Sequence, residues 1–161
     1  MIQAQPVIDL ETAKSQARNT YRETLECLKN HCLAQNETQF YDRVIKVLNR
    51  TPIYWEKIGL LDGGQTHRRR NDNGQFSYEI IMNIKFLYSE DAASFIKYTL
   101  IHELAHVIAD VYDGSFCHNE TFQRFDRLFG GTGKESLTCK KPILKIHIDT
   151  SMRVICAPRR S

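Results

Sequence analysis

The chain has 161 residues, 42% of them apolar and 25% charged, and a formal net charge of +3. The length suits one domain, and the composition is that of a soluble globular protein. The longest apolar runs fall far short of the ~20 residues that cross a bilayer, which excludes a membrane-spanning protein. The mild charge permits contact with nucleic acid but does not predict it.

The start of the chain and the cysteines indicate a compartment. The first ten residues lack a basic stretch followed by an apolar one, so no signal peptide is expected. The cysteines are an odd set of five without the spacing of a disulfide framework: Cys27, Cys32, Cys117, Cys139 and Cys156. We therefore expect reduced thiols and a cytoplasmic protein. Association with a nucleoid or a nucleus is the alternative location.

The N-terminal part, residues 9–50, is predicted to be helical. Asp9 is well placed to cap a long amphipathic helix over residues 9–34. A second helix is expected to end near Arg50, because Pro52 lacks an amide hydrogen and disfavours helix in the residue before it.

The next part of the chain changes to β character. Aromatic and branched residues are dense in residues 53–60 and 76–84, and a short polar segment, residues 65–70, lies between them. Turn signals separate the three segments at residues 62–64 and 71–74. The pattern predicts a three-stranded antiparallel meander.

Two more helices and a β tail complete the expected fold. The helices are predicted over residues 89–111 and 119–129, each followed by glycine, and alternating apolar residues predict a β tail over residues 138–157. The whole is expected to be a single α+β, zincin-like domain over residues 1–161, with helices packed on a small sheet and the catalytic core in residues 51–130.

The helix at residues 89–111 contains a His-Glu-x-x-His motif made by His102, Glu103 and His106. Side chains four residues apart lie on one helix face, so both imidazoles can reach one ion. Glu103 lies about 100° round the helix, where it can act on a water molecule held by the metal without binding the metal itself. Apolar residues fall on the opposite arc and are expected to anchor the helix in the core: Leu100, Leu104, Val107, Ile108 and Val111.

A catalytic zinc ion usually has three protein ligands, so the sequence must supply a third. Tyr112 and Ala109 occupy the positions where a metzincin has its third histidine and its glycine, which excludes that class. Glu120 and Glu135 are candidates for a gluzincin arrangement. His118 is preferred, because a turn after the motif helix would return the chain and place it at the start of the next helix. This set predicts a zinc metalloendopeptidase with Glu103 as general base.

Several segments resemble the SprT-like metalloproteases, the family of bacterial SprT and the eukaryotic protease Spartan. The resemblance covers roughly residues 50–130, and its parts are Tyr78–Asn83, Phe95–His106, His118–Phe122 and Leu128–Gly130. It implies that His102, His106 and His118 bind Zn2+ and that Glu103 is catalytic. Spartan-type members degrade proteins crosslinked to DNA and are activated by DNA. The resemblance therefore implies a protein substrate and extends to DNA repair, with single-stranded or protein-crosslinked DNA as a partner.

One feature departs from that family. Bacterial SprT proteins often carry a C-terminal zinc ribbon with two cysteine pairs, whereas this tail has only Cys139 and Cys156. Two thiols cannot complete a tetrahedral site, so the ribbon is interpreted as degenerate.

The densest positive cluster, made by His67, Arg68, Arg69 and Arg70, is a candidate nucleic-acid contact because cations in this number can bind phosphates. Asp110 is interpreted either as a hydrogen-bond acceptor for a ligand histidine or as a surface carboxylate. Two alternative functions stay open at this point. One is a gluzincin-type protease that cleaves a regulator and uses Glu120 as third ligand; the other is a non-catalytic DNA-associated binding module.

Overall fold

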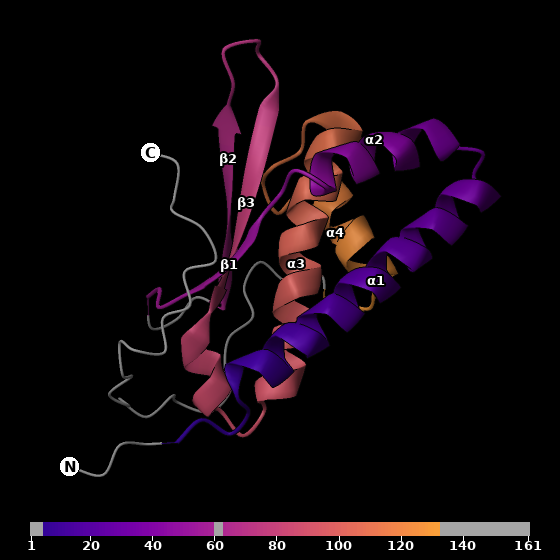
Figure 1. The fold of residues 1–161 in the computed structure, drawn as a ribbon. Helices are drawn as coiled ribbons and strands as arrows, with labels where there is room; N and C mark the ends of the chain where they lie inside the picture. The colour runs from indigo at the N-terminus through magenta and orange to yellow at the C-terminus, as the bar shows by residue number, and fades with distance from the viewer. Residues whose placement is uncertain (1–4, 60–62, 133–161) are drawn as a thin grey trace.

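The computed structural model describes residues 5–59 and 63–132, and within these ranges four α-helices pack against a three-stranded sheet (Figure 1). This arrangement confirms the α+β class predicted from the sequence. In chain order the elements are α1 (Leu10–Ala34), α2 (Thr38–Leu48), β1 (Ile53–Glu56), β2 (Gly64–Arg70), β3 (Phe76–Asn83), the 3-10 helix η1 (Ile84–Tyr88), α3 (Ala92–Asp113) and α4 (Glu120–Leu128). The predicted β tail with its degenerate ribbon, residues 138–157, lies outside the described residues.

The first two helices form an antiparallel pair that covers α3. Helix α1 begins where predicted, because the Asp9 carboxylate accepts a hydrogen bond from the amide of Thr12 at 2.7 Å and satisfies a free donor of the first turn. Amides of Val7 and Ile8 donate to the carbonyl oxygen of Leu87, which ties the start of α1 to η1. Both helices bury one apolar face in the common core.

The sheet has the order β1-β3-β2 and is mixed, so the predicted all-antiparallel meander is wrong in one pairing. Strands β2 and β3 form the expected antiparallel hairpin, closed by residues 71–74 with Gly74 at φ 83°. Strand β1 instead pairs in parallel with β3, with Ile53 opposite Ile80.

Burial explains why β3, not β2, takes the central place. Four consecutive residues at the end of β3, Ile80 to Asn83, are buried, so both faces of the strand are covered. A strand buried on both faces needs a neighbour at each edge. The second half of β2, from His67, is exposed, and its charged side chains keep it at the edge, where they can reach water.

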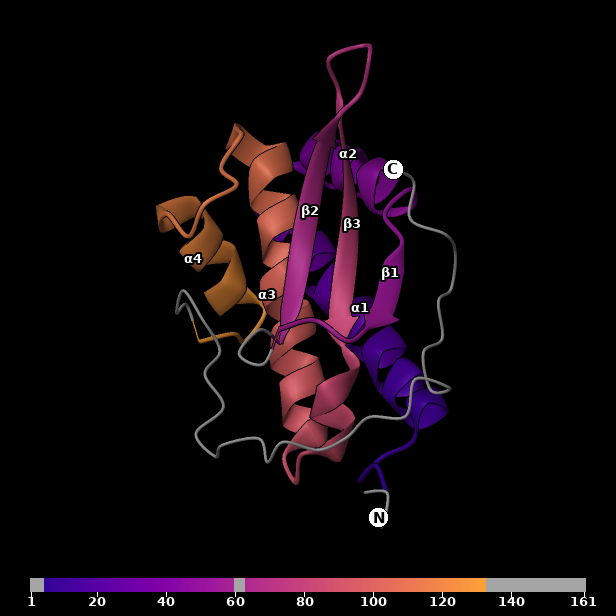
Figure 2. The same ribbon diagram turned by 90° about the vertical axis from the view of Figure 1, so that its left-hand side faces the viewer.

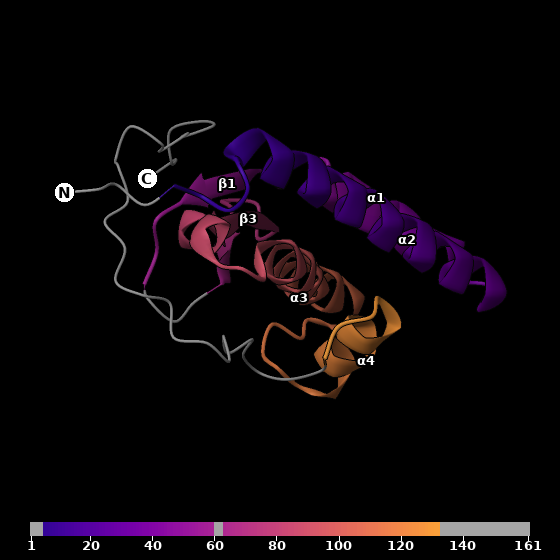
Figure 3. The same ribbon diagram turned by 90° about the horizontal axis from the view of Figure 1, so that it is seen from below.

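Helix α3 lies at the centre of the domain. It contacts α1, α2, α4, η1, β2 and β3, and every residue from Thr99 to Asp110 is buried. Figure 2 shows α3 behind the sheet, and Figure 3, seen from below, shows it between the α1–α2 pair and α4. The motif predicted to bind metal therefore lies on the most enclosed helix, whose backbone is held on all sides. Among the described residues, no helix combines the length and apolarity needed to cross a membrane.

Candidate metal centre

Two histidines of the site come from one face of α3. His102 and His106 lie one turn apart, with ring centroids 5.0 Å from each other, and each residue is only 8% exposed. Leu100, Leu104, Val107 and Ile108 are fully buried, as the sequence predicted for the opposite arc, and they anchor the helix in the core. Val111 is only partly buried.

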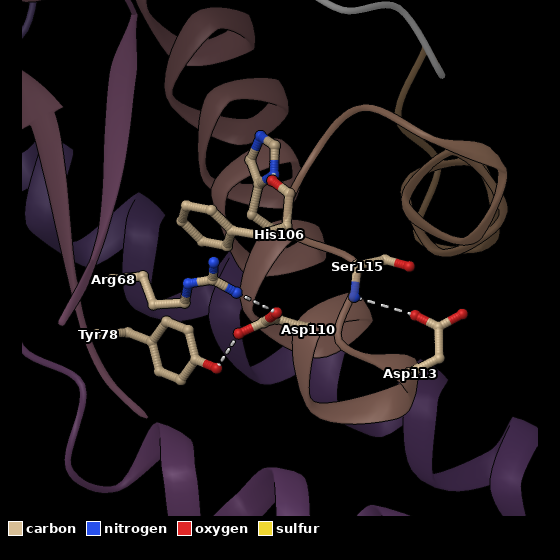
Figure 4. Close-up of polar contacts among 7 residues, drawn as sticks. Arg68, Tyr78, His106, Asp110, Asp113 and Ser115 are labelled. Atoms are coloured by element: carbon tan, nitrogen blue, oxygen red, sulfur yellow. Dashed lines mark hydrogen bonds and ion pairs between the residues drawn. The ribbon is translucent and has the colours of Figure 1, made fainter. Parts of the chain in front are cut away.

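A tight turn after α3 brings the third histidine back. Gly114 ends the helix at φ 77°, a left-handed conformation in which a residue with a Cβ is strained. The Asp113 carboxylate accepts hydrogen bonds from the amide of Ser115 at 3.1 Å and the hydroxyl of Thr121 at 2.6 Å, and so joins the turn to α4; the contact with Ser115 is drawn in Figure 4. Asn119 caps α4 by accepting from the amide of Phe122 at 3.1 Å. His118 is thereby held immediately before α4.

The three imidazoles converge. Nε2 of His118 lies 3.1 Å from Nε2 of His102 and 3.1 Å from Nε2 of His106, and the candidate ligand atoms all lie within 4.8 Å of one another. Two nitrogens bound to a tetrahedral zinc at about 2.0–2.1 Å from the ion lie about 3.3 Å apart. The donor set and its spacing therefore fit one metal ion of this kind.

The Phe122 ring forms one wall of the cluster. Its centroid lies 4.8 Å from that of His102, 4.4 Å from that of His106 and 4.9 Å from that of His118, and the residue is fully buried. An apolar wall on this side restricts the positions of all three rings and excludes water from behind them.

The surroundings keep two of the histidines uncharged. Burial first, and then the nearby His106 and His118, lower the pKa of His102 to about 3. Burial and His118 lower the pKa of His106 to about 4, against an opposing hydrogen bond to the Phe116 carbonyl. Both rings are neutral at pH 7, so their lone pairs are available to a metal ion.

These shifts predict how the stability of the metal-free protein depends on pH. The unfolded histidines have pKa values near 6.5. Below that pH the unfolded chain therefore binds protons at these two histidines, whereas in the folded protein they stay unprotonated to a lower pH. The contribution of these two histidines to the free energy of unfolding should therefore be constant above about pH 6.5. It should fall toward pH 4 by up to about 1.4 kcal/mol per pH unit for each histidine. Urea denaturation of chelator-treated protein measures the slope. A His102→Asn, His106→Asn double variant should show a shallower slope, and equal slopes in the two proteins would contradict the assignment.

A backbone carbonyl orients His106. Nδ1 of His106 lies 3.1 Å from the carbonyl oxygen of Phe116, and a carbonyl can only accept, so Nδ1 carries the proton and Nε2 keeps its lone pair. Neither interpretation of Asp110 is correct: the residue is buried, at 7% exposed, and its hydrogen bonds are not to a ligand histidine. Asp110 accepts from Arg68 and Tyr78 instead, because it lies one turn beyond His106, where α3 packs against the strands.

Glu103 lies beside the histidines and faces β2. The residue is 5% exposed, and its Oε2 accepts a hydrogen bond of 2.5 Å from the hydroxyl of Thr66. The same hydroxyl lies 3.2 Å from the backbone oxygen of Glu103. A Cβ atom on Gly64 would stand 3.1 Å from Cγ of Glu103 and 2.7 Å from Cγ2 of Thr99, so glycine is what lets β2 approach α3 here.

The alternative third ligands are not at the cluster. Glu120 is exposed in the first turn of α4 and is absent from the group of residues that could hold a metal in the described part of the chain. Glu135 lies outside the described residues. Tyr112 packs edge-on against Phe40 and Phe125. Cys117, next to His118 in the sequence, is exposed and is absent from the same group.

The positive cluster at residues 67–70 does not form one patch. Because side chains alternate along a strand, Arg68 points to one side of β2 and His67 and Arg69 to the other. Arg68 is paired with Asp110 at 2.7 Å and its side chain is 30% exposed. His67, Arg69 and Arg70 are exposed and remain the candidates for phosphate contact.

The fold and the site together define a class of protein. It is an α+β domain with a His-Glu-x-x-His helix at its centre and a third histidine beside that helix. The family model described as SprT-like family matches residues 29–140, which is most of the chain, and the chain belongs to this family. The match confirms the resemblance seen in the sequence and extends it at both ends. Neither the curated proteins nor the solved structures contain a match.

Proposed function

We propose that this protein is a zinc-dependent endopeptidase of the SprT-like type, and that its substrates are proteins bound or crosslinked to DNA. The observation that carries the proposal is the convergence of His102, His106 and His118, with a buried carboxylate beside them. Three imidazoles are the protein ligands of a common catalytic zinc site, in which the fourth position is left for water. Family membership supports the same reading.

The chain's own residues divide the work of peptide hydrolysis. Zinc bound by the three histidines would supply a Lewis acid, which acidifies water and polarises the scissile carbonyl. Glu103 takes the proton of the attacking water and delivers it to the departing amine, a role typically worth about 10² to 10⁴ in rate. The Thr66 hydroxyl donates a hydrogen bond to one carboxylate oxygen of Glu103. This contact fixes the Glu103 side chain and therefore the direction of its other oxygen.

The role of Thr66 can be tested by an isosteric change. In Thr66→Val the hydroxyl is lost while the shape is kept, so we expect kcat to fall about tenfold, with KM and zinc content unchanged, because about 1.4 kcal/mol of positioning is removed. Thr66→Ser retains the donor and should recover most of the activity. Equal kcat in the valine variant, or failure of serine to recover it, would show that the Thr66 hydroxyl does not position Glu103 for catalysis.

DNA contact is proposed for the outward-facing side of β2 and its hairpin end. His67, Arg69 and Arg70 are exposed there, and cations at such positions bind phosphates with an affinity that falls as salt rises. Arg68 is left out of this surface, since its guanidinium is engaged by Asp110.

A cleavage assay tests the proposed function. Zinc-loaded protein should cleave a basic DNA-binding protein, cleavage should stop after chelation and return when zinc is added, and single-stranded DNA should accelerate it. The Arg69→Ala, Arg70→Ala double variant should lose the acceleration and keep the basal rate. If the protein retains zinc but cleaves nothing, the proposed protease activity is contradicted and a non-catalytic binding module is favoured. If cleavage occurs at the same rate with and without DNA, only the proposal of DNA-bound substrates is contradicted, and the protease activity stands.

A further inference from the structure

Three residues from different elements form a polar group around a buried carboxylate, one helical turn beyond His106. The Asp110 side chain is 1% exposed, and Arg68 Nη1 donates to its Oδ1 at 2.7 Å. The hydroxyl of Tyr78 donates to its Oδ2, and both contacts are drawn in Figure 4. Arg68 and Tyr78 stand directly opposite each other on β2 and β3. One cross-strand pair thus supplies both donors to a carboxylate on α3.

Tyr78 keeps its proton at neutral pH and so acts as a hydrogen-bond donor. Burial, and then its hydrogen bond to the Asp110 carboxylate, raise the pKa of the phenol far above its usual range. A neutral phenol and a guanidinium together satisfy a carboxylate that would otherwise be buried at high cost.

The Arg68 guanidinium also joins this group to the turn before α4. Its carbon lies 4.4 Å from the ring centroid of Phe76 and 4.6 Å from that of Phe116. Arginine stacks on aromatic faces while its edge still donates, which lysine cannot reproduce. Phe116 is the residue whose carbonyl oxygen lies 3.1 Å from Nδ1 of His106, and its ring packs at 5.7 Å from that of His106.

We propose that Arg68, held by Asp110 and Tyr78, is a positioning residue of the metal centre. It clamps the Phe116 ring, and the Phe116 carbonyl then keeps the proton of His106 on Nδ1 and its Nε2 toward the metal. This inference rests on the metal site of the proposed function. From the sequence, Arg68 was grouped with the candidate nucleic-acid contacts. The inference gives it a role in metal affinity instead.

The chain of contacts is short and stiff enough to transmit this effect. Asp110 lies four residues beyond His106 on the same helix, so the ion pair also fixes the rotation of α3 against the sheet at that turn. Loss of a group that orients a ligand histidine typically lowers metal affinity about 10- to 100-fold. In Arg68→Lys the loss is expected without a comparable loss of fold, because lysine keeps a positive charge near Asp110 and Tyr78 still donates to its carboxylate.

Two variants test the clamp, with a matched control. Arg68→Lys keeps the charge near Asp110 but loses the stacked planar fork, and Phe116→Leu keeps the carbonyl but loses the ring. Both should bind zinc about 10- to 100-fold more weakly than the wild type in competition with a chromophoric chelator. Both should also change the visible absorption of the cobalt-substituted protein. Arg69→Ala, one residue away on the opposite side of β2, should change neither. The melting temperature of each metal-free variant shows whether it is folded.

The outcomes separate this inference from the proposed function. If the wild type binds zinc and both folded variants bind it equally well with an unchanged cobalt spectrum, the clamp is refuted and the metal site stands. If one variant fails to fold, the other decides by the same criterion. If the wild type itself binds no zinc, the proposed function fails, and the clamp fails with it.

Discussion

Glu103→Gln is expected to abolish peptide cleavage while the protein keeps its zinc. Glutamine has nearly the same shape and can still meet the Thr66 hydroxyl, but it cannot accept the proton of an attacking water molecule. The three histidines are untouched, so metal binding has no reason to change. We expect kcat to fall by about 10² to 10⁴, the usual contribution of a positioned general base.

The measurement is cleavage of a DNA-binding protein under single-turnover conditions, with zinc determined on the same samples. Glu120→Gln is the matched control, since Glu120 is an exposed glutamate in α4 and lies outside the histidine cluster. Activity of the Glu103 variant equal to that of the wild type would refute the assigned role. Loss of zinc along with activity would instead place Glu103 among the ligands.

His118→Ala is expected to weaken zinc binding by more than about 100-fold, because a direct ligand is lost and not only a group that orients one. The Nε2 atom of His118 is within 3.1 Å of the Nε2 atoms of both other histidines, and no other His, Cys, Asp or Glu of the described residues joins the cluster. Competition with a chromophoric chelator gives the affinity.

Glu120→Ala separates the histidine site from the gluzincin alternative in the same assay. It should bind zinc as the wild type does, since the carboxylate is exposed in the first turn of α4. If Glu120→Ala empties the site and His118→Ala does not, the gluzincin arrangement replaces the site made by three histidines.

The sequence was sufficient for the helices and for the convergence of the histidines, because the signals are local. Asp9 and Asn119 cap the helices they precede, and Gly114 ends α3 at the expected place. A four-residue spacing on a helix and a glycine turn determine the direction of the chain over a few residues. His118 could therefore be placed near the motif before any tertiary contact was known.

The errors are in features that depend on partners distant in sequence. Nothing in Ile53–Glu56 indicates that its neighbour is β3 and that the pairing is parallel, because either orientation satisfies the same side-chain pattern. The interactions of Thr66 and Arg68 were missed for the same reason. Alternation along β2 places both on one face, but their partners Glu103 and Asp110 lie on α3, and only the packing of helix on sheet brings them together.

The proposed activity depends on three imidazole nitrogens sharing one zinc ion, and X-ray absorption spectroscopy of the zinc-loaded protein measures that directly. We expect one zinc per chain with three nitrogen ligands at about 2.0–2.1 Å, the imidazole scattering pattern, and a fourth light atom from water. In His118→Ala the imidazole contribution should drop to two. A spectrum dominated by sulfur or carboxylate ligands, or a wild-type protein that retains no zinc, would contradict a zinc site made by three histidines.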